Sequence, residues 1–205
     1  MSASETLKHT TVTFYEKAMI WESWFWRSDL KKFALSLRKR ASQKRWPDAA
    51  LARCEQSIMV GFFFVRKLIE SRKLSRDFAD RQIQVIAYPA KGKHIHLMNA
   101  RRDVEELFDL DAPKQLNLKF EDLANQLIHS YIFYLSIEES GALQGILVAS
   151  DRIRNRELLE VSARDIIKIF ELAAKGEGHK AISMNYDNKR QDYVVRLAKP
   201  QKRRA

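Results

Sequence analysis

The sequence predicts an α+β fold in which a helical bundle is followed by a small antiparallel sheet, with a β-hairpin inserted in the bundle. In residues 11–42, apolar side chains recur every three to four positions, which is the period of an amphipathic helix. Beyond Gly145, apolar and polar residues alternate, which is the period of a strand. The 205 residues include only six glycines and four prolines, and this scarcity favours long helices over a turn-rich all-β fold.

The first two helices are predicted from residues 11–42 and from a segment that begins near Pro47 and ends near Arg72. Proline suits the first turn of a helix, because the first turn does not use its amide hydrogen. Residues 58–65 are apolar on every side of the second helix. A helix with this pattern is typically central and packed by several neighbours. We therefore expect residues 58–65 to be among the most buried of the chain.

The rest of the helical part, residues 1–140, is expected to contain a hairpin and a third long helix. Residues 82–88 and 94–98 alternate like strands around a turn, so the hairpin is placed near 82–98. A short helix follows at about 102–107, and the third long helix is predicted over residues 118–137.

Residues 141–198 are predicted to form the antiparallel sheet, with one helix that shares the core. The expected strands and the helix are, in order, 145–150, 157–162, the helix 165–174, 181–186 and 192–197. No linker rich in proline, glycine or serine separates this part from the helical part, so a common core is expected. Residues 199–205 form a basic tail.

Composition excludes several classes of protein. With 45% hydrophobic and 31% charged residues the chain is not disordered, and its longest apolar run, 58–65, is far too short to span a bilayer. The N-terminal residues lack an apolar signal core, so a cytoplasmic protein without a membrane partner is expected. The single cysteine, Cys54, forbids an intrachain disulfide, and His94 and His96 have no third ligand nearby. Neither a metal site nor another cofactor is expected.

The net charge of +11 is concentrated in two blocks. Residues 27–45 carry eight lysines or arginines and one acid, and residues 196–205 carry a further net charge of +5. Such blocks attract polyanions because binding releases the counterions of the polyanion, and nucleic acid is the commonest polyanion. The first block therefore suggests a nucleic-acid contact through Arg38, Lys39 and Arg40. The alternative is a solvated face that only aids solubility.

A second candidate contact is the turn between two predicted strands, which carries Arg152, Arg154 and Arg156. In an extended segment, side chains at alternate positions point to the same side, where they could bind phosphates together. A solvated hairpin tip explains the same pattern.

Polar side chains that could take part in a reaction are concentrated on one face of the predicted third helix. Four polar residues stand there at helical spacing: Asp122, Asn125, Gln126 and His129. The imidazole of His129 can accept or donate a proton near neutral pH, and the amide of Asn125 can orient it or bind an oxyanion. Alternatively this face is solvated, or His129 belongs to a hydrogen-bond network of the core.

The Asn125–His129 spacing, together with Arg66-Lys67-Leu68 near the end of the central helix, resembles the HEPN superfamily of bacterial toxin, defence and RNA-processing domains. The resemblance implies a dimeric helical fold over roughly residues 10–140 and, in active members, metal-independent RNA cleavage. The family motif has an arginine four to six residues before the histidine, but this chain has Asp122-Leu123-Ala124 there. Only His129 and, loosely, Asn125 match it.

Cleavage would then need a cation from elsewhere to stabilise the charged transition state. Arg66 is the candidate, although Glu70, four residues later, could instead bind it in a structural ion pair. The resulting hypothesis is an RNA-binding, HEPN-like protein that could form a homodimer. It would be either an endoribonuclease of a bacterial defence or toxin system or a catalytically degenerate relative. The alternative is a non-catalytic protein-interaction subunit of a defence or regulatory complex.

Overall fold

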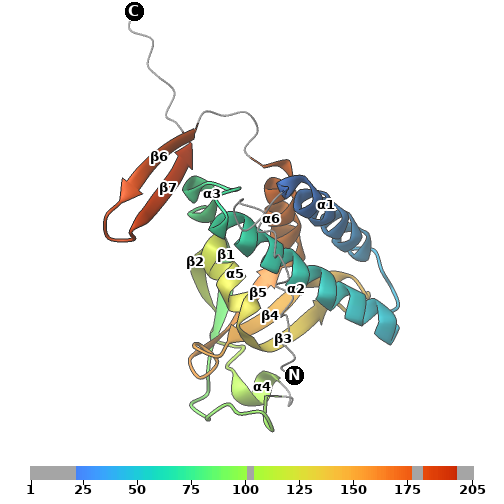
Figure 1. The fold of residues 1–205 in the computed structure, drawn as a ribbon. Coiled ribbons are helices and arrows are strands. Elements are labelled where there is room, and N and C mark those ends of the chain that lie inside the picture. The colour runs from blue at the N-terminus through green and yellow to red at the C-terminus, as the bar shows by residue number, and fades with distance from the viewer. Residues whose placement is uncertain (1–21, 101–103, 177–181, 198–205) are drawn as a thin grey trace, which may run out of the picture.

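The computed structural model describes residues 22–100, 104–176 and 182–197, and its centre is a five-stranded antiparallel sheet (Figure 1). The strand order is β2-β1-β5-β4-β3, and β6 and β7 form a separate two-stranded hairpin. The strands are β1 (Gln82–Pro89), β2 (Lys114–Lys119), β3 (Ser130–Ile137), β4 (Leu143–Ser150), β5 (Glu157–Ser162), β6 (Ile182–Asp187) and β7 (Asp192–Leu197). The helices are α1 (Ser23–Arg40), α2 (Asp48–Glu70), α3 (Arg76–Ala79), α4 (Val104–Leu107), α5 (Phe120–Ile128) and α6 (Ala163–Lys175).

The predicted order of a helical bundle followed by a sheet is wrong, because the sheet is central and has helices on both sides. Strands β1, β2 and β3 come from the part predicted to be helical, whereas β4 and β5 come from residues beyond 140. Strand β5 lies between β1 and β4, so the two parts of the chain build one sheet. A HEPN-like bundle over residues 10–140 does not describe this arrangement.

The predicted third helix, 118–137, is also wrong. Helix α5 ends at Ile128, His129 is its C-cap, and the chain continues directly as strand β3. Tyr131, Ile132 and Phe133 are of the aromatic and β-branched types that favour strands. Ile132 is buried and pairs with Ala149 of β4. Apolar residues in this stretch fit both periods, so tertiary pairing decides the outcome.

The predicted hairpin near 82–98 is correct only in its first strand. Strand β1 pairs with β2 and β5, and residues 94–98 form no strand. Ile95 is buried, and its amide donates to the Asn155 side-chain oxygen at 2.8 Å. The connection from β1 to β2 therefore spreads over the sheet instead of turning back beside β1.

Most other elements confirm the predictions within a few residues. Helix α2, strands β4 and β5, helix α6 and the β6–β7 hairpin lie where periodicity placed them. Of the predicted first helix, the structure describes the part from Ser23 onward as α1. Residues 11–21 of that prediction and the tail 199–205 lie outside the described residues.

The main core lies between the sheet and the layer formed by α1, α2, α5 and α6. Helices α5 and α6 pack on β4, and α2 packs against α1, α5 and α6. Phe62 of α2 is fully buried, with its ring centroid 5.1 Å from that of Phe170 on α6. The segment 58–65 is nevertheless not buried all round, because Val60 and Phe63 are 38% and 41% exposed.

The opposite face of the sheet is covered in part by the connection between β1 and β2, which includes α4. Tyr134 of β3 faces this side, and its hydroxyl donates to the Ala100 carbonyl at 2.5 Å. Phe108, just after α4, is fully buried. In Figure 1, α4 accordingly lies at the bottom of the view, at the far end of the molecule from α1 and α6.

Tyr88 and Glu160 form a hydrogen-bonded pair on this second face, with 2.5 Å between the hydroxyl and the carboxylate oxygen. Burial, together with the neighbouring Glu160 carboxylate, raises the pKa of Tyr88 to about 12, from 10.0 in the absence of these effects. Because the pKa of Tyr88 is higher in the folded state than in the unfolded state, the protonated hydroxyl stabilises the folded protein at pH values below 10. This stabilisation is lost as the pH rises from 10 to about 12. We expect Tyr88→Phe to reduce the loss of unfolding free energy between pH 9.5 and 11.5, measured by urea denaturation at both values. An equal loss in the wild type and the variant would contradict this.

In the part of the chain that the structure describes, no helix is both long enough and apolar enough to cross a membrane.

Candidate nucleic-acid interface

Helices α1 and α6 lie side by side and run in opposite directions, and the seam between them is hollowed at two places. One hollow, of about 700 Å³, lies between the start of α1 and the end of α6, where Trp24 and Lys31 face Lys175. The other, of about 560 Å³, lies between Arg38 and the start of α6. Glu171 borders both hollows, and we call the seam that contains them the α1–α6 groove.

Helical periodicity explains why both helices present the groove residues on one face. Arg164, Lys168, Glu171 and Lys175 are spaced by four, three and four residues and form one stripe on α6. The opposite side of α6 is apolar and buried, with Ile166, Ile169, Phe170 and Ala173. On α1, the buried residues are Leu30, Ala34 and Leu37, which leaves Lys31 and Arg38 facing outward. Burial of the apolar stripes therefore fixes the orientation of the charged ones.

The groove is strongly cationic. The carboxylates on its border are those of Glu138 and Glu171. The six cations that border it are Arg27, Lys31, Arg38, Arg164, Lys168 and Lys175. Arg38 forms an ion pair with Glu171, which is thereby neutralised. Arg27 donates to the Lys73 carbonyl at 2.7 Å and packs against Gly176 at the end of α6.

Four of these cations have no acidic partner among the described residues: Lys31, Arg164, Lys168 and Lys175. All four are exposed. Their charges are therefore available to a polyanion. The aromatic ring of Trp24, 63% exposed, lies at one end of the same groove.

The sequence pointed to the basic block 27–45, but the structure divides that block. Of Arg38, Lys39 and Arg40, Arg38 borders the groove. Arg40 donates to the Gln43 side chain at 2.7 Å and lies over the Trp46 ring at 5.2 Å, so its role is structural. Lys39 is exposed. The cations of α6 were not predicted as a binding site, although their spacing in the sequence places them on one face of a helix.

The arginine-bearing turn, residues 151–156, is compact and not extended as predicted. The Arg154 amide donates to the Ser150 carbonyl at 3.0 Å, and Ile153 is buried. The Arg154 guanidinium lies 3.7 Å from the centroid of the Tyr131 ring and 3.3 Å from the Asp151 carboxylate. Arg152 and Arg156 are exposed. The three arginines therefore do not form one phosphate-binding row.

His129 is exposed at the C-terminal end of α5, and its carbonyl accepts the Asp151 amide at 3.1 Å. The structure thus brings His129 next to the turn 151–156. Asn125 lies one helical turn earlier, with its side-chain oxygen buried and without a hydrogen-bond partner among the described residues.

Arg66 lies on α2, which packs against α5, but its guanidinium binds Glu70 at 2.6 Å. Burial opposes ionisation of Glu70, yet Lys67 and Arg66 outweigh it and lower the pKa of this carboxyl. This is the structural ion pair that the sequence left open. Among the described residues, no hydrogen bond connects Arg66 to His129.

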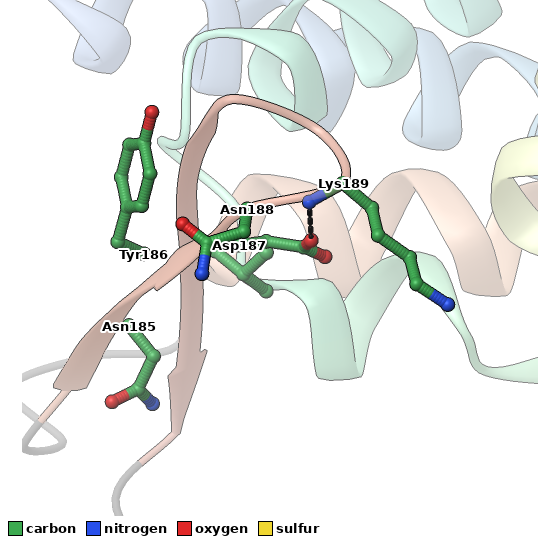
Figure 2. Close-up of a pocket in the computed structure, with 6 residues that line it drawn as sticks. Asn185, Tyr186, Asp187, Asn188 and Lys189 are labelled. Carbon is green, nitrogen blue, oxygen red and sulfur yellow. Dashed lines mark hydrogen bonds between the residues drawn. The ribbon is translucent and has the colours of Figure 1, made fainter.

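A further hollow, of about 410 Å³, lies at the turn of the β6–β7 hairpin (Figure 2). The Lys189 amide donates to the Asp187 carboxylate at 2.9 Å, which holds the turn. Figure 2 shows the Lys189 side chain pointing away from Asn185 and Tyr186. This hollow lies at the tip of the ribbon and shares no lining residue with the α1–α6 groove.

Comparison with known proteins found no matching family model, no similar curated protein and no similar solved structure. Within the described ranges, no group of three histidine, cysteine or acidic side chains could hold a metal ion. Cys54 is buried, and burial raises the pKa of its thiol to about 11, against 9.0 for an exposed thiol, despite the nearby charge of Arg40. It is therefore protonated and unreactive near neutral pH.

Proposed function

We propose that this protein binds nucleic acid through the α1–α6 groove. The observation that carries the proposal is the convergence of two cationic stripes, from helices far apart in the sequence, on one hollowed seam. Cations along a groove can each contact a phosphate, and each phosphate neutralised releases counterions. A solvated surface gains nothing from bringing like charges together, since their repulsion opposes folding.

The groove offers little base-specific recognition. Most of its polar border is lysine and arginine, which bind phosphate oxygens without reading sequence. We therefore expect binding that depends weakly on base sequence. RNA is the nucleic acid predicted from the sequence, and RNA and DNA strands of one sequence would decide between the two.

Chemical footprinting tests the location. The protein is acetylated with and without a 20-nucleotide RNA, and the modification of each lysine is measured by mass spectrometry. We expect protection of Lys31, Lys168 and Lys175, while Lys93 and Lys114, which are exposed outside the groove, stay reactive. Uniform protection, or none, would contradict the assignment. The alternative outcome is that a protein partner binds the groove. In that case the groove lysines would be protected by a nuclease-treated cell extract and would not be protected by RNA.

Cleavage of the bound RNA is a second candidate function, favoured by the position of His129 next to the arginine-bearing turn 151–156. The His129 side chain is exposed, so His129→Ala should leave the melting temperature within about 1–2 °C of the wild type, as for a neutral surface substitution. If His129 transfers a proton in cleavage, the variant should lose RNA cleavage measured in the presence of EDTA, while RNA affinity is retained. Wild-type protein that leaves RNA uncut would end this hypothesis without affecting the binding proposal.

A further inference from the structure

The β6–β7 hairpin has one face that no other part of the described chain covers. Alternate residues of a strand point to opposite faces, so Met184 and Tyr186 share a face, and Tyr193 joins them because it pairs directly with Tyr186. These three side chains are 61%, 49% and 55% exposed. The two tyrosine rings lie edge to face, with their centroids 5.2 Å apart. An exposed aromatic pair thus lies near the turn of the hairpin, next to the Asp187–Asp192 pair that ends the ladder.

The rest of the hairpin is tied to the body of the molecule. Arg72 forms an ion pair with Asp192, and its Nε donates to the Tyr193 carbonyl at 3.1 Å. Val194, on the face opposite the tyrosines, borders a small hollow beside Ile69 and Leu74. Strand β7 packs against α3. The tyrosine face is consequently the outward one, and Figure 1 shows the hairpin standing at the margin of the molecule.

We propose that the Tyr186–Tyr193 pair is a stacking platform for unpaired nucleobases, which makes single-stranded nucleic acid the ligand. This inference rests on the proposed function, because the groove would supply most of the phosphate contacts. Aromatic side chains stack on bases of any sequence, since every base has a π-face. Bases in a duplex are already stacked and cannot reach the platform.

The size and the charge of the patch favour a base over a protein surface. Three side chains on one narrow ribbon are far fewer than the 20–30 residues that each partner contributes to a stable protein interface. They are enough for one or two bases. Lys189, exposed at the turn, has no acidic partner among the described residues, and the sequence after the hairpin, residues 198–205, carries a net charge of +4. Lys189 is therefore available to bind the phosphate of a nucleotide whose base stacks on the platform.

The test compares wild type with Tyr186→Leu/Tyr193→Leu, which keeps apolar cross-strand packing but removes both rings. Fluorescence anisotropy is measured with a 20-nucleotide single strand and with a 20-base-pair duplex. We expect the affinity for the single strand to fall by about 5- to 150-fold, and the affinity for the duplex to stay unchanged. The salt dependence of the remaining binding should not change, because no phosphate contact is lost.

Tyr186→Phe/Tyr193→Phe is the matched control, because it keeps both rings, and it should bind like the wild type. Equal affinities of the leucine variant and wild type for the single strand would overturn the platform, as would an equal loss with both ligands. A leucine variant that changes the sedimentation coefficient would show that the face joins two copies of the chain, and would also overturn it. Wild type that binds neither ligand would overturn the groove proposal together with this one.

Discussion

Replacing Phe62 with alanine is expected to lower the free energy of unfolding by roughly 3–5 kcal/mol, the range for emptying a large site in a core. The Phe62 side chain is fully buried between α2 and α6 and packs edge to face on Phe170. The neighbouring Gly61 lies so close to the Phe170 ring that a Cβ at this position would clash with it, which shows that α2 and α6 are tightly packed here. Little rearrangement could fill the cavity.

Phe63→Ala is the matched control for this prediction. It removes the same ring from the next position, where the side chain is 41% exposed. Urea denaturation should give a clearly smaller loss for Phe63→Ala than for Phe62→Ala. If the two losses were equal, α2 would not be the central helix of the core.

The second large effect is expected in binding. Arg164→Glu/Lys168→Glu reverses two groove cations that are exposed and have no acidic partner among the described residues, so folding should be unaffected. The affinity for a 20-nucleotide strand should fall on the order of tenfold to a hundredfold at 0.1 M salt, because two phosphate contacts are lost and two repulsions are gained.

Lys93→Glu/Lys114→Glu makes the same change of net charge away from the groove. Titration of a labelled strand should show a loss of at most a few-fold for this control. Comparable losses in the two double variants would mean that overall charge, and not the groove, determines binding.

Parts of the fold could be predicted because local periodicity agrees with the tertiary structure. Strand β5 is rich in buried apolar residues, Leu158, Leu159 and Val161, and ends at the Ser162 cap of α6, and its bounds match the prediction. Helix α2 carries its buried stripe from Cys54 to Ile69 at helical spacing. In these segments no competing pattern is present.

Other parts could not be predicted, because partners far away in the sequence decide them. Residues 130–137 have apolar side chains on both sides and become a strand only because β4 is available to pair with them. The insertion of β5 between β1 and β4 leaves no local trace. Strand β2 is exposed over most of its length and lacks the alternation of a half-buried strand.

The candidate site shows the same limit. The sequence identified a basic block, and Arg38 within this block borders the groove. The sequence did not reveal the partners of other cations in the block: Trp46 lies under Arg40, and Asp29 binds Lys32 at 2.8 Å. Likewise, Arg154 is one of three equivalent arginines in the sequence pattern, but in the structure its guanidinium lies over the Tyr131 ring. Arg164, Lys168 and Lys175 become a site only when α6 packs beside α1.

The salt dependence of nucleic-acid binding tests the central claim most directly. The dissociation constant of the wild type for a 20-nucleotide strand is measured between 0.05 and 0.4 M salt, beside Arg164→Glu/Lys168→Glu. If the groove binds phosphates, the logarithm of the association constant falls linearly with the logarithm of the salt concentration. The expected slope magnitude is about 3 or more for about four unpartnered cations, and about 1 to 2 less in the variant. A wild-type slope near zero, or the same slope in both proteins, would contradict nucleic-acid binding by the α1–α6 groove.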